Sequence, residues 1–362
     1  MAQNWTNTVS TIGTASRNFI DPTTWDGAIA SDLRTGGGAN EVGVMFADSD
    51  FTDVLLTIGP STLSNQTIAC GTKLRNAPGE KPVWKPGSGS AVSFYLEIPR
   101  VVSVTGIIFD GASRNLSSSS DGLVLFNSTG PGGIGGPKGQ GCTFKNSSRN
   151  GLRINSPSTI LIYCLAFDNV GGDGFHSTLG TGISFTAIFC GAAFNSGFGY
   201  GVINAAATSF LRNCWARGNT LGSIENIVST ASSPGNSSWL VIDDGRLTTI
   251  GATLGGADMV NVLENATQAQ FAFVNEAGRD FTPGPGSVLL GEGAEFGSNG
   301  GSFVSFDVNN ARLAFDWGDR MDVGPIQSKI AIIAEAAQII TPLTVSTGFA
   351  LDPTTGVEVI AP

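Results

Sequence analysis

The residues best suited to chemistry lie in a short glycine-rich stretch, Gly171–Ser177, around the sole histidine of the 362-residue chain. His176 follows Asp173 by three positions, across what the glycines predict to be a turn. A carboxylate beside an imidazole can form an acid/base pair, and any Ser-His-Asp or multi-histidine zinc site would need this one histidine. Asp173 and His176 are therefore candidates for catalysis. The alternative is that both are corner residues beside an inward-pointing Phe175.

Asp168 and Glu225 extend this candidate set to four residues. Glycosidases use two carboxyl groups about 5 to 10 Å apart, one protonated and one ionised. If coils of about 24 residues stack at one strand spacing, Asp168, Asp173 and Glu225 share a face of the molecule. Asp243 and Asp244 are adjacent, so on a strand they would point to opposite sides, which disfavours a joint role. The sequence thus offers acids without a complete catalytic set, and catalysis is not indicated.

The elements that position these residues follow a repeat of about 24 residues. Each repeat opens with a cysteine, and the four cysteines are spaced by 22, 26 and 24 positions: Cys142, Cys164, Cys190 and Cys214. Each phrase then reaches an asparagine: Asn146, Asn169, Asn195 and Asn219. Short apolar runs broken by Gly, Asn and Ser at this period are typical of a stacked fold with three short strands per coil. We therefore predict an all-β, single-stranded parallel β-helix in which these cysteines and asparagines form structural ladders.

Aromatic residues divide into two groups, those that recur with the 24-residue repeat and those that do not. Three phenylalanines follow the repeat, which predicts an internal stack: Phe144, Phe167 and Phe194. Three other aromatic residues depart from it and are candidates for an outward carbohydrate-binding platform: Tyr200, Trp215 and Trp239.

Composition excludes several classes of function. The net charge is −10 and the 19 basic residues are scattered, which argues against binding to nucleic acid. The most apolar segment, Ile330–Ile340, is 11 residues long and contains Glu335, which is short of the roughly 18 residues of a membrane-spanning helix. No histidine or carboxylate keeps step with the four cysteines, so we expect no metal and no cofactor.

Both ends of the chain depart from the repeat. Residues 1–36 are predicted to be an attachment segment with a short capping helix, since Asp21-Pro22 is a helix-start signal. Residues 37–327 form the predicted β-helix. Residues 328–362 are a β-rich appendage that includes the apolar segment Ile330–Ile340 and a hairpin within Phe349–Ile360. An apolar appendage predicts a partner surface, so we expect a homotrimer that associates or attaches through it.

Several phrases resemble right-handed parallel β-helix proteins of the pectate-lyase-like type, and the opening resembles β-helix proteins of tailed bacteriophages. The internal phrases are Cys164–Phe167 and Asn169–Phe175, the closing ones Gly278–Ser287 and Asp322–Gln327, and the opening ones Phe19–Asp32 and Asn40–Asp50. The resemblance implies a right-handed parallel β-helix and a bacteriophage virion protein.

Two functions follow from this resemblance as expectations. The first is a structural virion protein, an external head decoration or cement protein or a short spike, that contacts capsid or tail proteins. The alternative is a tailspike-like enzyme or binder of host surface polysaccharide, with hydrolase or lyase chemistry. The opening, Met1 to Trp5, has no signal-peptide pattern, which predicts synthesis in the host cytoplasm and a place on the virion, with no membrane partner.

Overall fold

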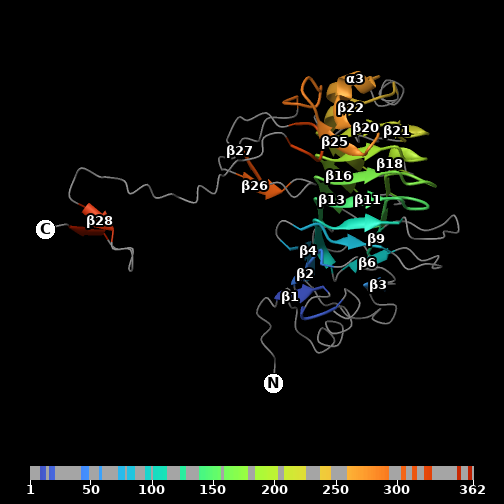
Figure 1. Ribbon diagram of the computed structural model, residues 1–362. Helices are drawn as coiled ribbons and strands as arrows, with labels where there is room; N and C mark the ends of the chain where they lie inside the picture. Colours follow the sequence, from blue (N-terminus) through green and yellow to red (C-terminus); the bar gives the residue numbers. More distant parts are fainter. Residues whose placement is uncertain are drawn as a thin grey trace.

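The structure is a computed structural model in which the coils of the chain stack into a parallel β-helix (Figure 1). It describes residues 9–13, 16–20, 42–48, 57–58, 72–77, 80–85, 94–98, 101–111, 123–127, 138–155, 159–177, 184–202, 208–225, 237–245, 259–292, 303–306, 312–315, 322–327, 349–351 and 358–360. Strands stack as rungs from β1 and β2 at one end to β22 at the other, where helix α3 lies (Figure 1).

Three faces make up the column. Face 1 contains β1 (Val9–Ile12), β2 (Val42–Met45), β4 (Thr72–Asn76), β7 (Val101–Thr105), β10 (Lys138–Gln140), β13 (Thr159–Ile162), β16 (Ser184–Ile188), β19 (Thr208–Arg212), β22 (Ser237–Ile242) and β23 (Met259–Leu263). Face 2 contains β5 (Val83–Trp84), β8 (Ile108–Asp110), β11 (Thr143–Lys145), β14 (Leu165–Phe167), β17 (Gly191–Ala193) and β20 (Trp215–Arg217). Face 3 contains β3 (Thr57–Ile58), β6 (Phe94–Ile98), β9 (Leu123–Asn127), β12 (Leu152–Asn155), β15 (Phe175–Ser177), β18 (Phe198–Val202) and β21 (Gly222–Ile224).

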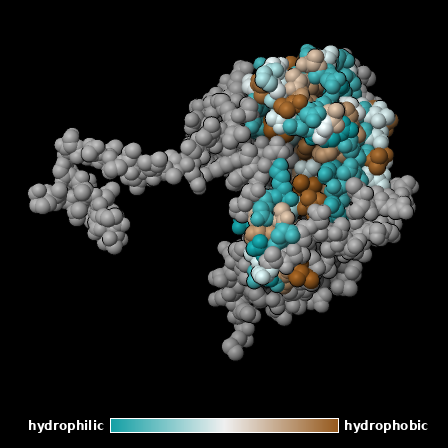
Figure 2. All heavy atoms as spheres, viewed as in Figure 1, coloured by the Kyte–Doolittle hydropathy of each residue, from teal (hydrophilic) through white to brown (hydrophobic). Residues whose placement is uncertain are grey.

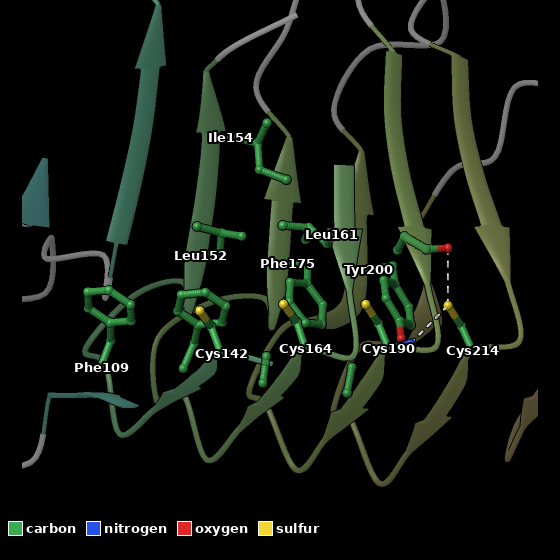
Figure 3. Close-up of a cluster of buried hydrophobic side chains, with 14 of the residues drawn as sticks. Phe109, Cys142, Leu152, Ile154, Leu161, Cys164, Phe175, Cys190, Tyr200 and Cys214 are labelled. Carbon is green, nitrogen blue, oxygen red and sulfur yellow. Dashed lines mark hydrogen bonds between the residues drawn. The ribbon is translucent and has the colours of Figure 1, made fainter. Parts of the chain in front are cut away.

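All pairings within these faces are parallel and link residues one coil apart, so like positions stack directly. The four cysteines lie fully or almost fully buried in one column inside the coils (Figure 3). Cysteine is small and weakly polar, so it packs there as a core residue. The prediction of an all-β parallel β-helix is confirmed.

The internal aromatic stack differs from the predicted one. Phe144 stacks on Phe109 with ring centroids 5.4 Å apart. It meets Phe175 edge-on at 6.1 Å, and Phe175 stacks on Tyr200 at 5.4 Å. In the coils that follow, the positions in register with Phe144 are alanines, Ala166, Ala192 and Ala216, all fully buried.

The prediction was wrong for Phe167 and Phe194. They stand three and four positions after their cysteines, whereas Phe144 stands two after Cys142. Because side chains alternate along a strand, Phe167 points outward from face 2. Phe194 lies at the following corner with a φ of 53°. Both pack outside the coil against Phe281.

A column of asparagine amides fixes the corner after face 2. The Nδ2 of Asn169 donates to the Oδ1 of Asn195 at 2.7 Å, and the Nδ2 of Asn195 donates to the Oδ1 of Asn219 at 2.8 Å. These amides also bond to coil carbonyls, so the buried polar groups are satisfied. Each coil is thereby fixed in register with its neighbour.

Asn146 was predicted to belong to this column but lies one position before it. Ser147 occupies the ladder level, where its backbone N–H donates to the Oδ1 of Asn169. The first phrase is one residue shorter than the others, which places Asn146 at the left-handed corner with a φ of 56°. Asparagine tolerates that conformation, and its Nδ2 donates to Asp110 at 2.9 Å.

After Leu263 the chain leaves the column and lies against the outer side of face 2. This flank segment, residues 264–292 with 322–327, contains α3 (Gln268–Phe271) and the antiparallel strands β24 (Phe273–Asn275) and β25 (Asp280–Pro283). Thr267 caps α3 in a capping box with Gln270. The side chains of Phe271, Phe281 and Leu289 are buried against outward residues of β14, β17 and β20.

The predicted boundaries compare with the described residues as follows. The parallel stack begins at β1, within residues 1–36, and its last described strand is β23, well before residue 327. Later strands pair antiparallel, β26 (Phe303–Phe306) with β27 (Arg312–Phe315) and β28 (Phe349–Leu351) with β29 (Glu358–Ile360). The last pair confirms the predicted hairpin. The predicted helix near Asp21 and the apolar segment Ile330–Ile340 lie outside the described residues.

Candidate functional site

Asp173 and His176 form a close buried pair. The Nδ1 of His176 lies 2.6 Å from the Oδ2 of Asp173, and the two side chains are 9% and 10% exposed. A carboxylate accepts, so the proton is assigned to Nδ1. The Oδ1 of Asp173 accepts the backbone N–H of Phe198 at 2.6 Å, one coil further along. The N–H of Asp173 donates to Asn150 in the preceding coil, so the pair sits at a junction of three coils.

Gly201 makes room for this pair. A Cβ at that position would overlap the Oδ2 of Asp173 and approach the Nδ1 of His176 to 3.1 Å. Gly201 lies opposite His176 in the parallel pairing of β15 with β18. The carboxylate of Asp173 therefore lies over the next coil, where any side chain larger than glycine would displace it.

His176 belongs to a row of outward positions on face 3. Arg153 lies opposite it in the pairing of β12 with β15. On the far side, Glu225 follows Gly201 at the next level, since its N–H donates to the carbonyl of Tyr200. The row thus passes from Arg153 through His176 and the Asp173 carboxylate to Glu225.

Of the four catalytic candidates, Asp168 lies apart from the other three. It occupies the left-handed corner after face 2, with a φ of 54°, and its Oδ2 pairs with the Nε of Arg279 at 2.7 Å. Asp173, His176 and Glu225 share face 3, as stacking at the coil period predicts. The expectation that Asp168 joins them is wrong, because its corner faces the flank segment.

Asp243 and Asp244 bind the last coils to one another. Asp243 accepts from Arg217 at 3.0 Å and from the N–H of Gly218 at 2.6 Å, while Asp244 accepts the N–H of Ser223 at 2.7 Å. Both carboxylates therefore act on the same neighbouring coil. Their contacts include backbone N–H groups, Arg217 and the Ser223 hydroxyl, and these contacts help to fix the register of the coils.

The predicted carbohydrate platform is wrong for Tyr200 and Trp215. Tyr200 points into the core, 2% exposed, with its hydroxyl donating to the carbonyl of Trp215 at 3.2 Å. Trp215 does point outward from face 2, but the rings of Phe271, Phe273 and Phe281 cover it, so it is 1% exposed. Trp239 lies in β22, and its side chain is outside what the structure describes.

The four cysteines of the internal column are buried core residues. Burial raises the pKa of the Cys190 thiol well above its ordinary value, and the neighbouring Cys164 and Cys214 sulfurs add to the rise. Burial likewise raises the pKa of the Tyr200 hydroxyl, with Cys214 as the next cause. The Sγ of Cys190 donates to the carbonyl of Ile188, and the Sγ of Cys214 donates to the carbonyl of Ala187. These four thiols face inward and are buried in the core, so none of them is a surface nucleophile.

Among the described residues, no group of three or more His, Cys, Asp or Glu side chains is arranged to hold a metal ion. Within the same residues, no helix is long and apolar enough to span a membrane.

Sequence reasoning missed Arg153, Gly201 and the flank segment. Arg153 precedes His176 by one coil length, and alternation within Leu152–Asn155 sets it outward, so the period could have found it. Arg217 pairs with Glu276 at 2.9 Å across a sequence distance that no local pattern covers. The contact between Arg217 and Glu276 depends on how the flank segment folds back against face 2 after the last coil.

Comparison with known proteins does not show a family for this chain. No protein-family model matches it, and no curated protein matches it. Among solved structures, a crystal structure of pectate lyase Pel9A is similar, with a TM-score of 0.33 and 13% identity over 89% of this chain and 97% of that chain. So distant a likeness says nothing about activity. The parallel β-helix of this chain is established by its own strand pairings.

Proposed function

We propose that this chain is a structural protein of a bacteriophage virion, an external head decoration or cement protein or a short spike, whose β-helix forms a rigid column. The observation that carries the proposal is that four of the acidic residues considered for catalysis make contacts that hold the structure together. Asp168 binds the flank segment, Asp173 joins neighbouring coils, and Asp243 and Asp244 fix the last coils.

Rigidity is the physical property that this arrangement supplies. Buried amide ladders and stacked rings recur at each level, and the flank segment fastens across several coils at once. In a column of this kind each coil is stabilised by its contacts with the coils on either side. The phage assignment draws further support from the resemblance of Phe19–Asp32 and Asn40–Asp50 to phage β-helix openings.

The location on a purified particle tests this proposal. Virions are purified through density gradients, and copies of this chain are counted by quantitative mass spectrometry and located by cryo-electron microscopy. Hundreds of copies on the shell support decoration, and a few at the tail support a short spike. Absence of the chain from particles that contain every other virion protein contradicts the proposal.

The assembly state belongs to the same proposal. We expect a homotrimer whose contacts lie in residues 328–362, so a chain ending at residue 327 should remain folded and lose association. Analytical ultracentrifugation of both chains at micromolar concentration measures this. A full-length chain that sediments as a monomer, alone and on its particle, contradicts the trimer.

A second candidate function is an enzyme or binder of host surface polysaccharide. It is favoured by Asp173 and His176, where a carboxylate orients the imidazole by Nδ1 and leaves Nε2 for proton transfer. Incubation with host capsular polysaccharide tests it, with reducing ends and unsaturated uronates as the readouts. Release that is abolished by Asp173→Asn and by His176→Ala supports this function. Release that survives both variants, or no release, contradicts a catalytic pair.

A further inference from the structure

We propose that the outer side of face 3 carries a binding site for a ligand oxyanion, a carboxylate or a phosphate group, held between the Arg153 side chain and the Nε2 of His176. This site goes beyond the structural function proposed above and does not depend on it. It uses two side chains that the coil register sets next to each other.

The orientation of both side chains follows from their strands. Leu152 and Ile154 are fully buried in the core, so Arg153 between them points outward. Phe175 is fully buried in the same core, so His176 after it also points outward. Arg153 and His176 are partners in the parallel pairing of β12 with β15, which sets their strands about 4.8 Å apart.

In the imidazole of His176, Nδ1 is hydrogen-bonded and Nε2 is buried without a hydrogen-bond partner among the described residues. Its Nδ1 is bound to Asp173, and its side chain is 9% exposed. Its Nε2 is buried, and no described residue hydrogen-bonds to it. Buried polar atoms in folded proteins almost always have a partner, so this nitrogen indicates a group that is supplied from outside. On the doubly protonated ring, Nε2 is a donor and its partner is an acceptor.

The charges along the row define where an anion fits. Arg153 lies on one side of His176 and is a permanent cation with donors suited to carboxylate and phosphate. On the other side the Asp173 carboxylate lies over Gly201, and Glu225 follows at the next level. The acidic side repels an oxyanion, and the Arg153 side attracts it. The geometry therefore fixes the ligand oxygen between Arg153 and Nε2, with Asp173 as the residue that positions the ring.

The sole histidine gives this site a direct reporter. Histidine-selective NMR of the full-length chain yields one set of ring resonances, which needs no assignment variants. The chain is titrated separately with inorganic phosphate, with sodium glucuronate and with glucose as the uncharged control. We expect a saturable shift of the His176 ring signals with phosphate or glucuronate and none with glucose.

Two variants decide the outcome. Arg153→Gln should weaken anion binding by roughly tenfold or more, the loss expected for a charge-assisted contact. Arg212→Gln removes the same charge from an exposed position on face 1 and should leave binding unchanged. Circular dichroism checks that both variants are folded. Response to phosphate alone identifies a phosphate source, and response to glucuronate alone a sugar acid. No saturable shift with either anion, or equal binding in Arg153→Gln, overturns the proposal.

Discussion

The same coils present two very different outer sides, on face 2 and on face 3. Face 2 displays Leu165, Ala193 and Trp215, and the flank segment covers them with its own aromatic residues. Face 3 displays Arg153, His176 and the Asp173 carboxylate over Gly201. The inward residues of all three faces are buried in one apolar core, so the outward positions decide what each side does. One side binds the chain to itself, and the other carries the groups suited to a ligand.

The described surface fits this division. Figure 2 shows hydrophilic residues with hydrophobic ones in small separate groups between them. Among the described residues, the exposed large hydrophobic side chains are scattered: Ile20, Val170, Leu221 and Val274. The extensive apolar surface of face 2 is the part that the flank segment buries, which follows from the preference of proteins to cover such patches.

Phe281→Ala should produce the largest change, because this ring joins the flank segment to face 2. It is 2% exposed and contacts Phe167, Phe194 and Trp215. We expect a loss of about 3 to 5 kcal/mol in the free energy of unfolding of the cooperative unit that contains it. Urea unfolding followed by tryptophan fluorescence measures this. Val274→Ala, at a position 60% exposed in the same segment, should stay within about 0.5 kcal/mol of wild type. Equal effects of the two variants would refute the packing described for face 2.

Asn195→Ala tests what the two faces share, the internal amide ladder. The substitution leaves the Nδ2 and backbone N–H of Asn169 without their Asn195 acceptor. Unsatisfied buried groups cost about 1 to 3 kcal/mol each, so we expect a loss of about 2 to 3 kcal/mol in the free energy of unfolding. Thr220→Ala, at an exposed corner position, is the control. Equal urea midpoints for the two variants would show that the ladder contributes little.

The sequence predicted the features that follow from the length of the repeat. It missed those that depend on which face of a strand a residue occupies, and those that depend on where the chain folds back after the last coil. The 24-residue repeat correctly predicted parallel coils and inward cysteines, since each coil repeats the environment of the last. It failed for Phe167 because a shift of one position reverses the face of a strand. The contact between Arg279 and Asp168 joins residues 111 positions apart and depends on the path of the flank segment, which no local pattern encodes.

The sequence also predicted only part of the candidate site. Asp173 and His176 are three residues apart, so a turn brings them together, and sequence alone was enough to pair them. Asp168 lies only five residues before Asp173 but points to the other side, because Asp168 itself occupies the left-handed corner at which the chain turns. The row with Arg153 needs both the coil length and the strand phase, and both can be read from the sequence once the fold is known.

Gly201→Ala should affect face 3 while leaving face 2 intact. The added methyl would overlap the Asp173 carboxylate, and we expect a loss of about 1 to 3 kcal/mol in the free energy of unfolding from overpacking. The His176 ring signals should shift because the contact to Asp173 lengthens. Gly245→Ala, where a Cβ would approach its nearest neighbour to 3.4 Å, is the matched control. Unchanged His176 signals in Gly201→Ala would mean that the glycine is not required for the pair.

Arg279→Gln should have the smallest effect, although Arg279 touches both Asp168 and Phe194. Its Nε pairs with Asp168 at 2.7 Å and its guanidinium carbon lies 4.1 Å from the Phe194 ring centroid, but the two charged side chains are 34% and 28% exposed. Exposed ion pairs contribute at most about 1 kcal/mol, so the loss should stay below that value. A double-mutant cycle with Asp168→Asn isolates the pair, and its coupling should shrink further at high salt because solvent ions screen it. A coupling that is large and insensitive to salt would mean that the charges are shielded from water, and that polar contacts fasten the flank segment as firmly as the aromatic residues around Phe281.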